Sequence, residues 1–201
     1  MALKGLENAV RNLNSLSRQL VPNASAMAIN RVAQQAISFA THKVAKETIA
    51  GDNHKRGIPL RLVKQRIKLW KASGNFDVTK QRAKIRVNRG NLPAIKLGAA
   101  QVRLSRRKGQ LLRRGSVLKI GPYLFRDAFI QQLANGRWHV MKRIEGENRY
   151  PIDVVKIPLA TPLTQSFEEA RDRIVMSAFP KEISAALKQQ FRLYLTRRSS
   201  S

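Results

Sequence analysis

The chain has 201 residues, no cysteine and a formal net charge of +27, from 39 Lys and Arg against 12 Asp and Glu. The missing cysteine excludes a disulfide framework and thiolate chemistry, and no run approaches the roughly 20 apolar residues of a membrane span. The charge needs a neutralising partner, which is nucleic acid, an acidic protein ring or anionic lipid. The amphipathic N-terminus differs from a signal peptide, so we expect use in the cytoplasm or in a particle assembled there.

The first fifty residues predict two helices separated by a proline. Apolar residues recur at spacings of three and four through residues 3–20, which is typical of one helix face. Pro22 lacks an N–H group and restricts Val21, so we expect a break there. A longer helix is expected over residues 24–50, with Gly51 as its C-terminal cap.

The middle of the chain changes from helical to strand periodicity. Pro59 and the apolar spacing up to Trp70 predict a short helix with one basic face. From about Arg82, apolar and polar residues alternate, as in a half-buried strand. The sequence predicts strands over residues 82–88, 92–97, 101–104, 116–120, 128–133 and 138–144. Asn135-Gly136 is a strong hairpin signal between the last two.

The end of the chain returns to helix. One helix is expected over residues 161–176 and a last one from Pro180, followed by a frayed tail. The fold class is therefore α+β, with N-terminal helices, a central mostly antiparallel sheet carrying a basic hairpin arm, and C-terminal helices. We expect one domain over 1–201, divided into helices (1–50), a basic helix and loops (51–81), sheet (82–158), helices (159–197) and tail (198–201).

Positive charge is concentrated in the centre of the chain. Between Asn53 and Arg126 there are 21 Lys and Arg and a single acid, Asp77. The densest piece predicts a hairpin arm between two strands, flanked by Gly109 and Gly115. Its candidate contact residues for DNA or an acidic partner are Arg103, Arg106, Arg107, Lys108, Arg113 and Arg114. A solvated loop, or one that pairs with acids of another subunit, is the alternative interpretation.

The sequence offers little for catalysis or metal binding. His42, His54 and His139 have no metal-ligand spacing, and the acids near Arg171 fit a solvated helix surface. There is no nucleophile elbow and no phosphate-binding loop. We therefore expect no catalytic, cofactor-binding or metal-binding residues and no enzymatic activity. Aromatic residues do not interleave with the basic run, which argues against a stacking platform for single strands.

Residues 129–158, FIQQLANGRWHVMKRIEGENRYPIDVVKIP, are the most informative stretch. This block resembles the minor tail protein Z family of lambda-like siphophages. Residues 3–7, 26–31 and 85–98 are also similar to that family. The matching positions in the block are Phe129, Gly136, Arg137, Val140, Arg143, Arg149, Pro151 and Ile152.

The resemblance implies a tail completion protein that acts late in tail assembly, at the head-proximal end of the virion tail. It implies contacts with the tail terminator and other neck and tail-tube proteins, and with the genomic DNA end. It also implies a homo-oligomeric ring, for which we expect six copies. It implies no membrane association, no enzymatic activity and no cofactor. Assembly would take place in the host cytoplasm.

The residues themselves leave open the role of three arginines and the function of the chain as a whole. Arg137, Arg143 and Arg149 are either interface or phosphate contacts or a basic exposed sheet face. Gly136 serves the turn and Pro151 fixes the chain direction after the hairpin. The charge alone also fits a standalone DNA-binding protein without sequence preference, or a ribosome-associated protein.

Overall fold

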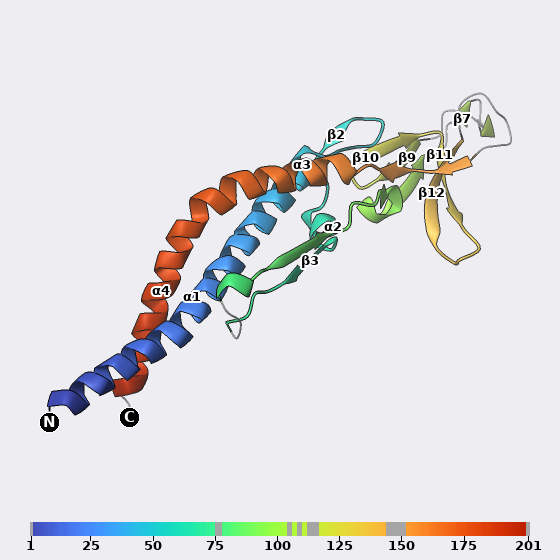
Figure 1. The fold of residues 1–201 in the computed structure, drawn as a ribbon. Coiled ribbons are helices and arrows are strands. Elements are labelled where there is room, and N and C mark those ends of the chain that lie inside the picture. The colour runs from blue at the N-terminus through green and yellow to red at the C-terminus, as the bar shows by residue number, and fades with distance from the viewer. Residues whose placement is uncertain are drawn as a thin grey trace. The chain divides into compact units, whose positions relative to one another are not determined.

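The computed structural model describes residues 2–74, 78–103, 106–107, 110–111, 117–143 and 152–199. They form the predicted α+β fold, with helices near both ends of the chain and antiparallel strands between them (Figure 1). The chain divides into two compact units. Unit 1 consists of Met1–Ala40, Ile67–Val87 and Phe167–Ser201, and unit 2 consists of Thr41–Arg66 and Asn88–Ser166. The predicted single domain and its subdivision stay predictions.

The predicted break at Pro22 is wrong. One helix, α1 (Ala2–Glu47), runs through it with Pro22 inside. A proline in a helix interior costs roughly 3 kcal/mol, and packing of the next two turns offsets this cost. Ala24 and Ala28 are fully buried against Ala186, and the Gln81 side chain donates a hydrogen bond to the Pro22 carbonyl at 2.9 Å.

The C-terminal helices also join where a separation was predicted. Helix α3 (Ala160–Ala170) passes through a π-helix, η3 (Arg171–Val175), into α4 (Met176–Ser199). Pro180 therefore lies inside α4 and does not start it, which corrects the predicted boundary. Proline and π-turns bend helices without ending them, so the chain stays helical through both.

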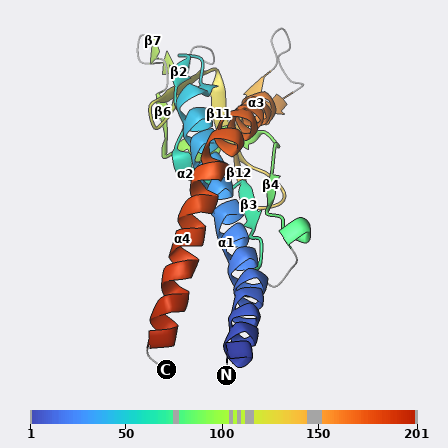
Figure 2. The ribbon, with the colours of Figure 1, turned by 60° about the vertical axis from the view of Figure 1, so that its left-hand side comes forward.

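Small side chains form the contact between α1 and the C-terminal helices in unit 1. Figure 2 shows α4 on one side of α1 and the β3 strand on the other. One cluster is centred on Ala28 and Ala186, with Ile183 packed against it. A second joins Ala40 to Ala170. Alanines at these positions let the helix backbones approach closely.

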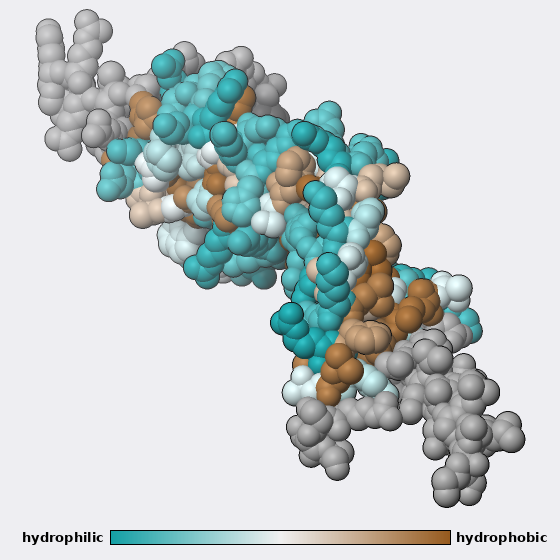
Figure 3. All heavy atoms as spheres, turned by 90° about the vertical axis from the view of Figure 1, so that its left-hand side faces the viewer, coloured by the Kyte–Doolittle hydropathy of each residue, from teal (hydrophilic) through white to brown (hydrophobic). Residues whose placement is uncertain are grey.

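Towards its C-terminus α4 leaves large apolar side chains exposed, among them Phe191 and Leu195. Figure 3 shows apolar side chains gathered at this end of unit 1, while hydrophilic side chains cover most of the rest of that face. None of the helices in the described part of the chain has the length and apolar character that a membrane span requires.

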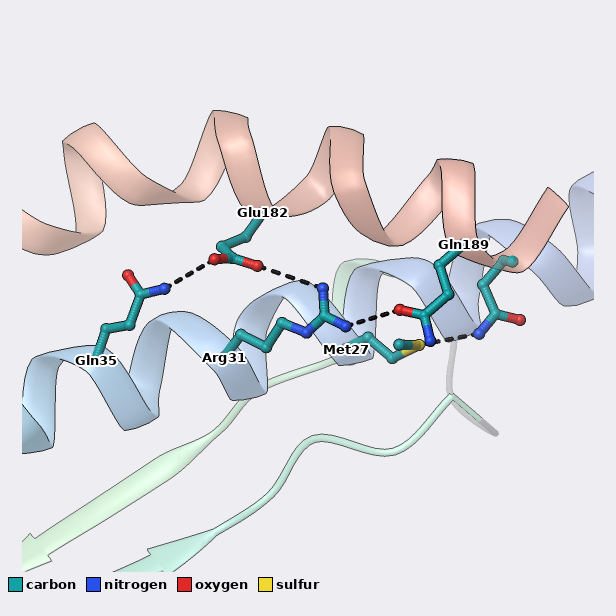
Figure 4. Close-up of polar contacts among 6 residues, drawn as sticks. Met27, Arg31, Gln35, Glu182 and Gln189 are labelled. Atoms are coloured by element: carbon teal, nitrogen blue, oxygen red, sulfur yellow. Dashed lines mark hydrogen bonds and ion pairs between the residues drawn. The ribbon is translucent and has the colours of Figure 1, made fainter. Parts of the chain in front are cut away.

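Polar side chains bridge α1 and α4 beside the alanine contact (Figure 4). The Arg31 guanidinium lies 3.4 Å from a Glu182 carboxylate oxygen and donates to the Gln189 side-chain oxygen at 2.7 Å. Gln35 donates to the other Glu182 oxygen at 2.8 Å. The Glu182 carboxylate is thus held by two successive turns of α1, which fixes how the two helices are aligned.

Only the first part of the helix predicted between Pro59 and Trp70 forms. Helix α2 (Leu60–Lys64) forms, but the chain then enters strand β3 (Ile67–Trp70), which pairs with β4 (Lys84–Val87). Burial alternates along both strands, with period two instead of a helical period. The side-chain amide of Asn30 on α1 exchanges two hydrogen bonds with the Ala72 backbone, at 2.8 and 2.9 Å, and ties the end of β3 to the helix.

Unit 2 is built from small antiparallel sheets. One has the order β10–β9–β6 and another β11–β12–β13, and the pairs are β1–β2, β5–β14 and β7–β8. Their bounds are β1 (Ile49–Ala50), β2 (Lys55–Arg56), β5 (Leu92–Pro93), β6 (Ala100–Arg103), β7 (Arg106–Arg107), β8 (Gln110–Leu111), β9 (Val117–Ile120), β10 (Tyr123–Arg126), β11 (Ala128–Gln132), β12 (Trp138–Arg143), β13 (Ile152–Val154) and β14 (Lys156–Ile157).

Three local predictions for unit 2 need correction. The helix expected over residues 24–50, with Gly51 as its cap, ends at Glu47, because Ile49–Ala50 pair with β2 as strand β1. The expected strand at 92–97 is a two-residue strand followed by a 3-10 helix, η2 (Ala94–Leu97), because Pro93 precedes it and Gly98 ends it. Strand β10 was not predicted. It brings Tyr123 and Phe125 into the core beside Leu118. Burial raises the pKa of Tyr123, whose hydroxyl donates to the Gly57 carbonyl at 2.6 Å.

The alanine contact gives the first testable prediction. Ala186→Leu places a larger side chain where none fits, because Ala186 is fully buried between α4 and α1. We expect a loss of about 1–3 kcal/mol in unfolding free energy, measured by urea denaturation. Ala185→Leu on the exposed side of α4 is the matched control and should change stability by less than about 0.5 kcal/mol. Equal effects of the two changes would contradict the assigned contact.

Candidate polyanion interface

Two antiparallel strand pairs of unit 2 contain the described residues of the predicted basic arm. Strands β6 and β9 pair in antiparallel register, with Arg103 opposite Val117. Beyond them β7 pairs with β8, Arg106 opposite Leu111 and Arg107 opposite Gln110. Three of the six candidate contact residues, Arg103, Arg106 and Arg107, thus lie on paired antiparallel strands. Lys108, Arg113 and Arg114 lie outside the described residues.

The second candidate region is the hairpin of β11 and β12. Its strands pair from Ala128–Lys142 to Gln132–Trp138, as the Asn-Gly signal predicted. Gly136 has a φ of +72°, a conformation that glycine adopts without steric cost. The Asn135 side chain accepts a hydrogen bond from the Arg137 N–H at 3.0 Å, which closes the turn. Gly136 therefore has the turn role that the sequence assigned to it.

The structure separates the arginines of this region. Arg137 is exposed in the turn, whereas Arg143 is exposed at the far end of β12, opposite Ile152. At about 3.3 Å per residue, their backbones lie about 20 Å apart, so they do not form one binding point. Phe129 is half-buried and pairs across the sheet with Met141, which makes it a packing residue. Arg149 and Pro151 lie outside the described residues.

Several carboxylates in the described residues pair with cations or backbone N–H groups of the same chain. Asp52 accepts a hydrogen bond from the Arg126 N–H at 2.7 Å, and its oxygen lies 3.7 Å from the Lys142 ammonium. On the C-terminal helices Glu169 pairs with Arg173 at 2.9 Å. Asp172 pairs with Arg171 at 2.8 Å and raises the pKa of that arginine. With 39 basic against 12 acidic residues, internal pairing can neutralise only a minority of the cations.

The described residues contain no group of three or more His, Asp or Glu that could hold a metal ion. The three histidines lie on different elements. His42 is on α1, His54 is in the loop between β1 and β2, and His139 is on β12. This arrangement gives no geometry for a shared metal or a proton relay.

One basic surface was missed because its first half was predicted as a helix. In the β3–β4 hairpin, Trp70 lies opposite Lys84 and Lys68 lies opposite Arg86. All four side chains are exposed on one face, while their neighbours in sequence are half-buried. The alternation Ile67-Lys68-Leu69-Trp70 is the signal that could have revealed it.

Comparison with known proteins identifies the family. The family model described as "Prophage minor tail protein Z (GPZ)" matches residues 3–197. The chain belongs to this family. Two minor tail protein Z relatives match over 98% of this chain and 100% of their own length: the "Tail completion protein" of Escherichia phage N15, at 54% identity, and the "Tail completion protein Z" of Escherichia phage lambda, at 51%. No solved structure matches.

The turn of the β11–β12 hairpin in this minor tail protein Z member can be tested directly. Gly136→Ala should lower the unfolding free energy by about 1–2 kcal/mol, because alanine is strained at positive φ although no atom lies within 4 Å of the added Cβ. Gly136→Asn should lose less, since asparagine tolerates this conformation. Urea denaturation measures both. An alanine variant as stable as the parent would refute the assigned backbone role.

Proposed function

We propose that this chain is a non-catalytic structural protein of phage tail completion that acts at the head-proximal end of the tail. The observation that carries the proposal is full-length similarity to two tail completion proteins, with no segment of either relative left uncovered. The family match over residues 3–197 supports the same role. Its location would be the virion tail, with assembly in the host cytoplasm.

The charge supports a function that depends on being covered by other components. A protein with a net charge of +27 repels its own copies unless an anionic surface lies against it. The partners we propose are the tail terminator and other neck and tail-tube proteins. A ring of six copies, joined to these proteins through its positively charged surface, would complete the upper end of the tail and allow head–tail joining.

The second part of the proposal is that the protein positions the genomic DNA end for delivery. The stretch from Arg103 to Arg114 concentrates arginine, and its described strands pair antiparallel, β6 with β9 and β7 with β8. Arginine and lysine bind phosphates and fix position without reading base sequence. Contact with DNA would therefore be to the backbone and would weaken steeply with salt.

Deletion of the gene from a phage that depends on it tests the role. We expect particles with tails that are defective in joining or in genome delivery, and restored infectivity when the chain is supplied from a plasmid. Cryo-electron microscopy of whole virions should place the chain in the neck or upper tail. Fully infectious particles that lack the polypeptide would refute the proposal.

The arm carries its own prediction. Changing Arg106, Arg107, Lys108, Arg113 and Arg114 together to glutamine should leave the fold intact and reduce plaque formation by at least about tenfold, because phosphate or carboxylate contacts are lost. The matched control removes five exposed cations elsewhere: Lys55, Arg56, Lys181, Lys188 and Arg192. Circular dichroism checks the fold of both variants. Equal infectivity of the two would show that the arm has no special function.

A standalone DNA-binding protein without sequence preference is the second candidate, favoured by the net charge alone. It predicts nanomolar binding to free duplex at physiological salt, with a steep salt dependence. An electrophoretic shift assay separates the two. Tight duplex binding together with normal infectivity of the deletion phage would favour this second function.

A further inference from the structure

The outward face of the β3–β4 hairpin combines an exposed tryptophan with cations on both strands. Trp70 is 47% exposed and lies directly opposite Lys84. One step along the ladder, Lys68 lies opposite Arg86, and all three of these cations are exposed. We call Lys68, Trp70, Lys84 and Arg86 the basic ribbon.

The basic ribbon is held on a firm support within unit 1. On its inner side, Ala83 and Ile85 line an apolar groove of about 310 Å³ together with Val32 of α1. The Asn30–Ala72 hydrogen bonds and the Gln81–Pro22 hydrogen bond fasten the hairpin to α1. The outward side chains are therefore presented in a fixed register.

Positive charge continues beyond the basic ribbon. Lys84 and Arg86 are exposed alternate residues of β4, about 6.6 Å apart, and Arg82 is exposed two residues before Lys84. This spacing is comparable to that of successive phosphates along a nucleic-acid strand. The segments that follow β3 and precede β4 line a depression of about 600 Å³, with Lys71, Ser73, Thr79, Lys80, Gln81 and Arg82 as its lining. Ammonium, guanidinium and hydroxyl groups are the donors that phosphate oxygens accept from.

Two features of the basic ribbon need an external explanation. Like charges directly opposite each other on a sheet are destabilising, as Lys68 and Arg86 are. Lysines at a sheet edge can protect against aggregation, but protection does not explain a half-exposed tryptophan among them. An anion with an aromatic surface removes the charge repulsion and covers the indole ring.

We propose that the basic ribbon binds a single strand of nucleic acid, with phosphates on Lys68, Lys84 and Arg86 and an unpaired base stacked on Trp70. Charged grooves with aromatic platforms bind single strands in this way. An acidic protein surface fits less well, because lysine is depleted at protein–protein interfaces. Three of the exposed cations on β3, β4 and the residues beside them are lysines, Lys68, Lys71 and Lys84, and the other two are Arg82 and Arg86.

The proposal rests on the proposed function only for the source of the strand, which would be the end of the genome. Binding itself is measured with the purified full-length chain and a fluorescent single-stranded DNA oligonucleotide of mixed sequence. A duplex of equal length and a polyglutamate of equal charge serve as the other probes. Anisotropy titrations over a range of salt concentrations give the dissociation constants.

The charge test compares two triple variants. Lys68→Gln, Lys84→Gln and Arg86→Gln should weaken single-strand binding about tenfold and lower the salt slope by about two, since each phosphate contact of a single strand contributes about 0.7. The matched control is Lys181→Gln, Lys188→Gln and Arg192→Gln on exposed positions of α4. Equal losses in the two variants would show a general charge effect and overturn the proposal.

The stacking test uses the two exposed tryptophans. Trp70→Ala should weaken single-strand binding about tenfold and leave duplex binding unchanged, whereas Trp138→Ala, 56% exposed on β12, should change neither. If Trp70→Ala does not fold, the Trp138→Phe variant still reports, because quenching of Trp70 fluorescence by the single strand is expected there. Absence of quenching, or equal losses on duplex and polyglutamate, would overturn single-strand binding in favour of a general anionic or acidic-protein surface.

Infectivity separates this inference from the proposed function. Suppose that the deletion phage is not infectious and that basic-ribbon variants unable to bind DNA restore its full infectivity. The tail role then stands and the basic ribbon has no part in it. If the deletion phage is fully infectious, the tail role fails whatever the basic ribbon binds.

Discussion

Excess positive charge is the constraint on which the rest of the structure depends. With 39 basic and 12 acidic residues, even complete internal pairing leaves a charge of +27. The chain must therefore gain its stability mainly from contacts that involve no charge, and two of its few carboxylates lie where segments meet. Glu182 joins α4 to two turns of α1, and Asp52 joins a loop to β10 and β12. Exposed pairs of this kind contribute little individually, so their main effect is to fix alignment.

The apolar contacts are suited to this constraint because they are made by small residues. Alanines at the α1–α4 contact let the helices approach closely, and long side chains beside them then reach across. The same closeness explains why a helix with an internal proline stays continuous, since Ala24 and Ala28 are packed directly after Pro22. Tertiary packing outweighs local propensity here, as it commonly does in helices that bury one face.

The sequence predicted what depends on short-range patterns. The α+β order, the Asn135-Gly136 hairpin and the pairing of the strands on either side of the arm are confirmed. The wrong predictions concern segments whose apolar spacing fits both a helix and a strand, and prolines at which a helix can either end or continue. Ile67 and Trp70 fit a helix at spacing three, but Ile67 and Leu69 also fit a strand, and the partner β4 decides for the strand. Helix continuity through Pro22 and Pro180 depends on contacts more than a hundred residues apart, which no local pattern contains.

The same limit applies to the candidate sites. The arm is visible in the sequence because its arginines are adjacent, and its stretch from Arg103 to Arg114 contains no aromatic residue. For the basic ribbon the sequence shows only the alternation of β3, because Trp70 and Lys84 become neighbours through strand pairing. Aromatic residues are absent from the basic run, whereas strand pairing places Trp70 among cations of two strands. The two surfaces therefore differ in chemistry: the arm offers cations alone, whereas the basic ribbon adds a flat ring on which an unpaired base can stack.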